Sequence, residues 1–385
     1  MNRSILLLIS GAIACTPGMY PEEIPASEGT VSYPDLPALD AAITEEMSAS
    51  NVPGLSACII KDGETAWCSG YGYANLKTDL PATPTTPFML ASVSKTFAGV
   101  ALMHLIETGA LGLDDPINEH LGFEVIHPDE RNTEITARML LSHTSGIADN
   151  WDVIDQMVVD GDSSVSLGDF MEGYLTSGGQ WYDSYDNFLP EGVKGVSEYS
   201  NIGASLAAYL VEAVSGQPFD DYCDQNIFVP LQMEQTGWHL ADFDESTVAV
   251  PYEWYSNDWH GLAHYGYPDY PDGSLRTGAE QLSRFLAMFA NGGALGETRI
   301  LSSDTVAEMQ QAHYPNLDDT QGLIWYDWSL DGRTVTGHNG GDYGASTEMG
   351  FTADGVGFVV LMNGEGRNRT LENIEEAMLE AAQSL

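Results

Sequence analysis

The segment SVSKTFAGVALMHLIET, residues 92–108, predicts a long and largely apolar helix. Phe97 and Val100 are among its side chains available for burial, and Gly109 fits the helix end because glycine commonly terminates helices. Ser92 and Lys95 stand at its start, and a spacing of three places them on one face with Cβ atoms about 5–6 Å apart. The sequence therefore predicts a buried helix that presents a serine–lysine pair at its first turn.

This pair suits nucleophilic catalysis if the lysine amine is neutral. A lysine accepts the serine proton only in that form, so its pKa of about 10.4 must fall by about three units, or about 4 kcal/mol. Burial beside a second cation would lower the pKa in this way. The alternative is a serine cap followed by an exposed lysine. Only Lys95 of the four lysines (Lys61, Lys77, Lys95, Lys194) has a serine three residues before it, so we predict Ser92 as nucleophile and Lys95 as base.

A second motif is Tyr199-Ser200-Asn201. Tyr-x-Asn begins at five tyrosines, but only Tyr199 runs directly into an apolar helix, predicted at residues 202–214, and such a junction holds side chains rigidly. Tyr255 is the runner-up. Near the lysine, Tyr199 would share proton transfer and the Asn201 amide would hold a substrate carbonyl.

A third motif, His338-Asn339-Gly340-Gly341, ends a predicted strand. Glycines let a substrate approach the backbone closely, and an edge strand can hydrogen-bond an extended, peptide-like substrate. The alternative is a strand-to-turn junction with an incidental histidine. Alone, the motif favours this alternative. Taken together with the other two motifs, it predicts that His338, Gly340 and Gly341 contact the substrate.

Strands are predicted near both ends of the chain and helices in the middle. The expected strands are residues 54–60, 65–73, 334–338, 345–351 and 356–362, with breaks at Gly340-Gly341 and Asp354-Gly355, and the outer helices are residues 37–50, 278–291 and 370–383. Residues 252–270 are rich in Tyr, Trp and His and predict a loop whose rings line a pocket or cap the core. The fold class is therefore α/β (α+β): an antiparallel sheet built from both chain ends, flanked by helices, with a large mainly helical insertion.

The N-terminus predicts export. Residues 1–14 combine Arg3 with an apolar run and read as a signal peptide, and residues 15–35 as a tether. Cys15 follows Ala14 directly, as in bacterial lipoprotein signals, which predicts lipidation of Cys15 and a cell-envelope lipoprotein on the periplasmic or outer-membrane side. Ordinary cleavage at the same bond, with secretion, is the alternative. One domain is expected over residues 36–385, with a sheet lobe (36–115 and 270–385) and a helical lobe (116–269).

Two of the four cysteines, Cys58 and Cys68, flank a turn at Asp62-Gly63. A two-residue turn would pair Cys58 with Trp67 and leave Cys68 on the other face of the hairpin. A three- or five-residue turn would pair the two cysteines. The sequence leaves this disulfide open.

The composition is strongly acidic, with 57 Asp and Glu against 13 Lys and Arg and a formal net charge of -44. Such a surface repels phosphate backbones and disfavours nucleic-acid binding. It fits a protein that works in salty surroundings, or simply an acidic secreted protein. No paired His or Cys spacing suits a metal, so we expect neither a metal nor another cofactor.

The order and spacing of the motifs resemble the serine β-lactamase and penicillin-binding protein superfamily, and more closely its branch of class C β-lactamases, DD-peptidases and related esterases. The resemblance covers about residues 36–384. It extends to four further segments, namely LGLDDPI (111–117), LLSHTSG within 135–147, FVPLQM (228–233) and residues 273–293, which end in FANGG.

The resemblance implies a mechanism. Ser92 would be acylated, Lys95 and Tyr199 would shuttle the proton, Asn201 would orient the acyl-side amide, and the N–H groups of Ser92 and Gly341 would form an oxyanion hole. One departure matters: class C β-lactamases usually carry Lys-Thr-Gly where this chain has His338-Asn339-Gly340. The family's lysine helps to hold a substrate carboxylate, whereas a histidine is mostly neutral near pH 7.

We therefore expect an exported serine hydrolase that forms an acyl-enzyme and cleaves an ester, amide or D-amino-acid peptide. The alternatives are a slow-turnover sensor of β-lactams or cell-wall peptides, and a true class C-like β-lactamase. Expected partners are a small molecule or short peptide, without nucleic acid, and a membrane only through the lipid anchor. We expect a monomer.

Overall fold

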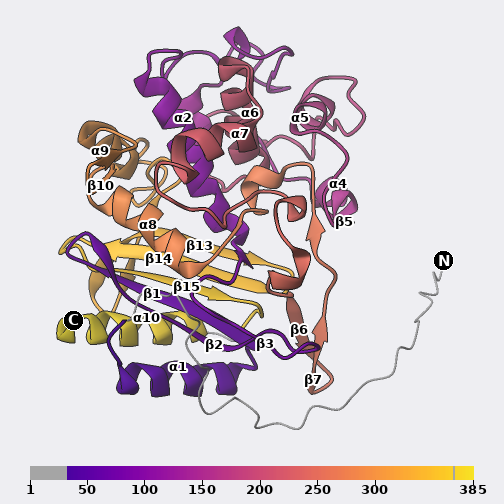
Figure 1. The fold of residues 1–385 in the computed structure, drawn as a ribbon. Helices are drawn as coiled ribbons and strands as arrows, with labels where there is room; N and C mark the ends of the chain where they lie inside the picture. Colours follow the sequence, from indigo (N-terminus) through magenta and orange to yellow (C-terminus); the bar gives the residue numbers. More distant parts are fainter. Residues whose placement is uncertain (1–32, 367–368) are drawn as a thin grey trace.

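The computed structural model describes residues 33–366 and 369–385, and Figure 1 shows a sheet with helices on both faces. The predicted signal peptide and Cys15 lie outside the described residues, as does the tether apart from residues 33–35. The helices are α1 (Pro37–Ser50), α2 (Lys95–Glu107), α3 (Ala137–Leu141), α4 (Trp151–Met157), α5 (Leu167–Leu175), α6 (Asn201–Ser215), α7 (Phe219–Cys223), α8 (Ala279–Ala290), α9 (Ser303–Gln310) and α10 (Thr370–Ala381).

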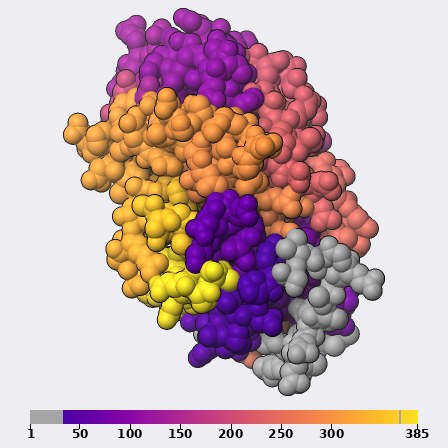
Figure 2. Space-filling view, turned by 60° about the vertical axis from the view of Figure 1, so that its left-hand side comes forward, coloured from indigo at the N-terminus to yellow at the C-terminus, as the bar shows by residue number. Residues whose placement is uncertain are grey.

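An antiparallel sheet joins the two ends of the chain, as predicted. Its spatial order is β12 (Tyr326–Leu330), β13 (Arg333–Asp342), β14 (Ala345–Thr352), β15 (Gly357–Met362), β1 (Gly54–Lys61), β2 (Glu64–Asn75) and β3 (Leu80–Pro81). The link between the ends is β1 against β15, with Leu55 opposite Met362. The space-filling view agrees, since the C-terminal residues in yellow lie against N-terminal residues in indigo (Figure 2).

Helices cover both faces of this sheet. α1 and α10 pack together on one face, and α8 and the helical region lie on the other (Figure 1). Along β1 the side chains alternate accordingly, because Ala57 and Ile59 join the core under α1 and α10, whereas Cys58 and Ile60 join the core under α8. A strand covered on both faces is largely apolar, and β1 is buried from Gly54 to Ile60 with Ser56 as the one polar side chain in that stretch.

The helical region is built around α2. This helix is buried almost throughout, and α6 packs along it. The predicted helix over residues 92–108 is confirmed with one change: residues Ala91–Ser94 form a 3-10 turn, and the α-helix begins at Lys95. Gly109 follows with a φ of +78°, the left-handed conformation that glycine adopts readily. Within the described residues, no helix combines the length and apolar character needed to cross a membrane.

The predicted break at Gly340-Gly341 is wrong. β13 continues through both glycines to Asp342, and Gly340 pairs with Thr347 of β14. A Cβ atom on Gly340 would lie 2.5 Å from the Leu90 carbonyl oxygen and 2.9 Å from the Ser92 nitrogen. This glycine is therefore required by close packing against the Ser92 turn and not by a chain reversal.

The predicted loop at residues 252–270 is partly wrong. It contains a hairpin of β6 (Tyr252–Tyr255) and β7 (Asp258–Gly261), followed by the short strand β8 (Tyr265–Gly266). Alternating aromatic residues fit the pleated surface of a strand, so their density here signals a hairpin. The remaining short strands are β4 (Phe88–Met89), β5 (Val159–Asp160), β9 (Arg276–Thr277), β10 (Ala294–Leu295) and β11 (Thr298–Arg299).

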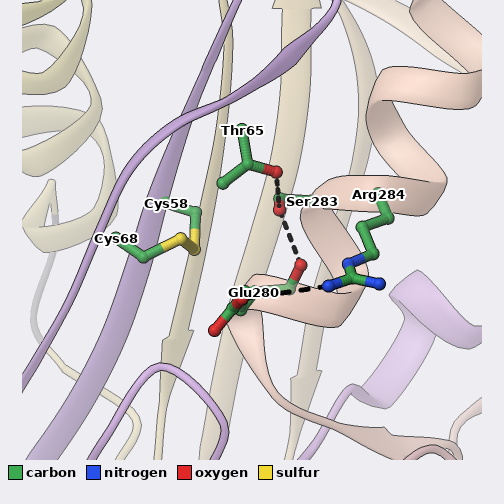
Figure 3. Close-up of a disulfide and its surroundings, with 6 residues drawn as sticks. All are labelled: Cys58, Thr65, Cys68, Glu280, Ser283 and Arg284. Carbon is green, nitrogen blue, oxygen red and sulfur yellow. Dashed lines mark hydrogen bonds and ion pairs between the residues drawn. A yellow bond between two sulfur atoms is a disulfide. The ribbon is translucent and has the colours of Figure 1, made fainter. Parts of the chain in front are cut away.

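The structure forms the disulfide that the sequence left open. The turn has two residues, Asp62 and Gly63, but a bulge between Ile59 and Ile60 shifts the register, so that Cys58 lies directly opposite Cys68. Figure 3 shows the bridge beside α8, where the Thr65 and Ser283 hydroxyls hydrogen-bond at 2.6 Å. The bulge replaces the longer turn that cysteine pairing was expected to need.

Candidate active site

Ser92 and Lys95 lie together at the start of α2. The Lys95 amine donates to Ser92 Oγ at 3.0 Å and to the Asp272 carbonyl oxygen at 2.6 Å. Lys95 is fully buried and Ser92 is partly exposed. The predicted serine–lysine contact is therefore present, with the serine on the accessible side.

The electrostatic environment of Lys95 differs from the sequence-based expectation. Burial alone would lower the pKa of Lys95, but the negative potential of Tyr199 and of the buried Asp272 outweighs it, and the pKa is raised above its ordinary value. Among the described residues, no cation contributes to the pKa of Lys95, and His338 is neutral because burial and Lys95 lower its pKa to about 3. Lys95 is thus an ammonium in the resting site, and the expected fall of its pKa is wrong.

Tyr199 lies over this pair, with its ring centroid 5.0 Å from the Lys95 amine. The ring packs against His143, with centroids 4.7 Å apart, and is 6.2 Å from the ring of His338. Burial lowers the pKa of His143 to about 3, so both imidazoles are neutral near pH 7. His143 was missed as a site residue, although it belongs to the LLSHTSG segment.

Asn201 is held at the first position of α6 by Asp149. The Asp149 carboxylate accepts from the Asn201 side-chain amide at 2.8 Å and from the backbone N–H groups of Asn201 and Ile202 at 2.9 and 3.1 Å. Ser200 caps the helix by accepting from Gly203 N–H at 2.8 Å. A buried carboxylate therefore fixes the Asn201 amide. Asp149 was missed because no motif marks it in the sequence.

β13 closes the site opposite Tyr199. Thr347 on β14 donates its hydroxyl to the Leu90 carbonyl at 2.5 Å, which ties the turn before Ser92 to the sheet. Gly340 packs against the Ser92 nitrogen, and the next residue, Gly341, lines the cavity together with Ser92. His338 lies buried behind this edge, without a hydrogen-bond partner for Nε2 among the described residues. Of the predicted contacts, Gly341 reaches the cavity wall and His338 does not.

A cavity of about 620 Å³ opens in front of Ser92. Ser92, Tyr199, Asn201 and Gly341 line it together, so the structure brings the three sequence motifs to one place. The other lining residues are Ala91, Trp151, Ile154, Asp155, Val158, Tyr267, Asp269, Asp272, Gly273, Asp342, Tyr343, Ala345, Ser346 and Glu365. The aromatic segment 252–270 contributes Tyr267, whereas Tyr252 and Trp259 pack elsewhere, with Tyr252 hydrogen-bonded to Leu76 N–H.

Two buried carboxyl groups form the cavity floor. Burial raises the pKa of both Asp269 and Asp272. The charge of Asp269 raises the pKa of Asp272 further, whereas a hydrogen bond with Asp272 lowers that of Asp269. Both belong to the segment PDYPDG, whose acids the sequence analysis did not single out. Among the described residues, no group of three or more His, Cys, Asp or Glu side chains is placed to hold a metal ion.

Comparison with known proteins identifies the family. The Beta-lactamase family profile matches residues 39–383. The chain therefore belongs to the β-lactamase family, which confirms the resemblance drawn from the motifs.

The individual relatives are distant. Protein flp of Staphylococcus aureus (strain MW2) is 25% identical over 285 residues, which is 74% of this chain and 53% of flp. The match thus spans about half the length of this curated relative. The structure of the octameric penicillin-binding protein homologue from Pyrococcus abyssi superposes with a TM-score of 0.70 at 25% identity, covering 89% of this chain and 76% of that one.

A class C β-lactamase from Rhodobacter sphaeroides superposes with a TM-score of 0.66 at 19% identity over 89% of this chain and 98% of that one. At this identity the likeness shows the fold alone, and it confirms the predicted fold class.

Proposed function

We propose that the protein is an exported serine hydrolase that cleaves an ester, an amide or a D-amino-acid peptide through an acyl-enzyme on Ser92. The observation that carries the proposal is the fully buried Lys95 amine, 3.0 Å from the partly exposed Ser92 Oγ at the mouth of a cavity. Burying an amine is costly unless it is paired, so a contact with a reactive hydroxyl in a cavity supports a catalytic role.

In this mechanism Ser92 Oγ attacks the substrate carbonyl and loses its proton. Because Lys95 is already an ammonium, the serine proton passes to Tyr199 in its phenolate form, which is the reactive state of the pair, with the Lys95 cation 5.0 Å from the ring. Tyr199 then passes the proton to the leaving group as its bond to the carbonyl breaks. Water releases the acyl group by the reverse route, giving its proton back through Tyr199 to Ser92.

The remaining residues act on the substrate. The N–H groups of Ser92 and Gly341 stabilise the oxyanion. Removing one such donor typically costs about 2.7–4 kcal/mol of transition-state stabilisation. Asn201, fixed by Asp149, binds the acyl-side amide. His338 and Gly340 support the strand edge beside Ser92. The neutral His338 offers no charge to a substrate carboxylate, which favours esterase or amidase chemistry over efficient β-lactam hydrolysis.

Export is supported by two features. The N-terminal segment has the pattern of a signal peptide, and the Cys58–Cys68 disulfide is stable in oxidising compartments. Lipidation of Cys15 and the monomeric state stay predictions.

An activity screen with wild type and Ser92→Ala tests the proposal. The panel consists of p-nitrophenyl acetate, nitrocefin and a D-alanyl-D-alanine peptide, and Ser48→Ala, an exposed serine on α1, is the control. We expect Ser92→Ala to lose at least about a thousandfold in rate on any hydrolysed substrate, with Ser48→Ala unchanged. Equal rates for Ser92→Ala and wild type would refute the assignment.

A further inference from the structure

The cavity in front of Ser92 is lined by carboxylates from four separate parts of the chain. Asp155 lies on α4, Asp342 at the end of β13, and Glu365 after β15, while Asp269 and Asp272 form the floor. Among the described residues that line this cavity, none is a lysine, arginine or histidine. The lining therefore offers negative charge, and the Lys95 ammonium is buried behind Ser92.

Within the described part of the chain, the two carboxyls on the floor have no ion-pair partner. The Lys95 amine bonds to Ser92 Oγ and to the backbone carbonyl of Asp272, and no ion pair joins it to either floor carboxylate. Asp269 is fully buried, and among the other described residues only Asp272 supplies a hydrogen bond to its carboxyl oxygens. A buried, poorly paired carboxyl resists ionisation, and a positive charge in the cavity would favour its ionised form.

The carboxylates nearer the mouth are held in place. Asp342 directly follows Gly341, and its side chain accepts from the Tyr267 hydroxyl at 3.0 Å and from Tyr343 N–H at 2.8 Å. Asp155 faces this edge from α4, because its charge is the main cause that raises the pKa of Tyr343. The two walls of the mouth therefore both present negative charge.

Aromatic rings stand beside these carboxylates. Trp151, Tyr343 and Tyr199 all line the cavity and are 56%, 45% and 43% exposed, which is unusual for large aromatic side chains. The face of an aromatic ring attracts cations, and a quaternary ammonium is bound well by rings of this kind. Carboxylates and exposed rings thus favour the same class of ligand.

We propose that this cavity selects acyl donors that carry a positive charge, such as an ammonium group, and discriminates against acyl donors that carry a carboxylate. The inference rests on the proposed hydrolytic function and narrows its substrate class. A substrate carboxylate would face Asp155, Asp342 and Glu365 without a cation in the lining. Like charges at short range lower binding affinity several-fold to many-fold. A cation would be attracted by the same groups.

Three p-nitrophenyl esters of matched shape test the inference: those of γ-trimethylammoniobutyric acid, of its uncharged tert-butyl isostere, and of glutaric acid as the half-ester. The quaternary ammonium does not titrate. We expect kcat/KM in the order cationic, neutral, anionic, with a cationic-to-neutral ratio of about tenfold or more, a factor that each 1.4 kcal/mol of attraction supplies.

A matched pair of double variants separates the cavity from the overall acidic surface. Asp155→Asn/Glu365→Gln removes two charges at the mouth, and Asp62→Asn/Glu45→Gln removes two exposed charges at the β1–β2 turn and on α1. We expect the cationic-to-neutral ratio to fall severalfold in the mouth variant and to stay at the wild-type value in the control. Circular dichroism and thermal unfolding confirm that both variants are folded.

Each outcome is decisive. If wild type hydrolyses the neutral ester through Ser92 but shows no preference for the cationic one, the inference is overturned and the proposed function stands. An equal fall of the ratio in both double variants also overturns it, since the preference would then come from the whole surface. Hydrolysis of none of the esters would overturn the inference together with the proposed function.

Discussion

His338 stands at the position where class C enzymes carry the lysine of Lys-Thr-Gly, and its environment keeps it uncharged. The side chain is buried, with the Lys95 ammonium nearby, and both effects lower its pKa to about 3. A histidine with this pKa stays neutral at every pH above about 4. It therefore cannot act as a proton donor in turnover near neutrality.

The pH dependence of hydrolysis checks this. In His338→Gln we expect a lower kcat/KM on a neutral ester, but the same shape of its pH profile as in wild type from about pH 5 to about pH 8. The reason is that neither side chain changes its charge in this range. Loss of an acidic limb in the variant would show that His338 titrates in wild type and would contradict the assignment.

At the scale of single residues, the sequence predicts which residues form the site better than it predicts their charge states. The spacing of Ser92 and Lys95 predicts their contact, because residues three positions apart lie on the same face of a helix. The charge state of Lys95 does not follow from spacing, since it depends on Asp272, which is distant in the chain and delivered by the fold. Asp149 and His143 were missed for the same reason.

At the start of α6, one set of hydrogen bonds both stabilises the helix and positions a site residue. Asp149 accepts hydrogen bonds from Ser200, Asn201 and Ile202, and so satisfies N–H groups that a helix start leaves unpaired. The same bonds fix the Asn201 amide at the cavity.

We expect Asp149→Asn to lower the free energy of unfolding by about 1–3 kcal/mol, because its NH2 group would face donors in place of an acceptor. The kcat/KM for a substrate with an acyl-side amide should fall more than the kcat/KM for an ester without this amide. Urea unfolding and kcat/KM measure the two effects. Asp152→Asn, an exposed neighbour on α4, is the control and should change neither. A functional loss without lower stability would contradict the anchoring role.

The contact of α10 with the sheet contains a buried acid pair. Glu375 on α10 faces Glu348 on β14, and burial raises the pKa of both carboxyls. The charge of Glu348 raises the pKa of Glu375 further, whereas a hydrogen bond from Glu375 lowers that of Glu348. The folded state therefore keeps a proton that the unfolded chain releases above about pH 4. It follows that the stabilisation by this proton is lost as the pH rises through the folded-state pKa values.

We expect Glu375→Gln to make the free energy of unfolding less dependent on pH in this range. From about pH 6 to about pH 9, wild type should lose about 1 kcal/mol or more in free energy of unfolding, and the variant clearly less. Glu380→Gln, exposed on the same helix, should follow the wild-type curve. Parallel curves for wild type and Glu375→Gln would contradict the acid pair.

Elements were predicted where periodicity is strong and missed where the sequence is ambiguous. The helix at residues 37–50 and the strands of the chain ends were placed within a few residues. The hairpin of β6 and β7 was taken for a loop because Pro and Gly interrupt its aromatic residues. The bulge beside Cys58 has no local sequence signal, so the pairing with Cys68 depended on a register that only the structure supplies.

For the whole molecule, the joining of both chain ends in one sheet explains the position of the site. β1 and β15 bring the ends together, and the helical region then lies over one face, with Ser92 at the boundary between β13 and α2. The strand pattern was sufficient to predict this architecture, and the family match agrees with it. The charge of -44 predicted no site, since it does not reveal which carboxylates converge on the cavity.

The central claim is that Ser92 becomes acylated, and intact-protein mass spectrometry tests it most directly. Wild type, Ser92→Ala and Ser48→Ala are mixed with an activated ester and quenched in acid within the first turnovers. We predict a mass increase equal to one acyl group in wild type and Ser48→Ala, located on Ser92 by peptide mapping, and none in Ser92→Ala. An acyl group on another residue, or hydrolysis by Ser92→Ala at the wild-type rate, would contradict the account.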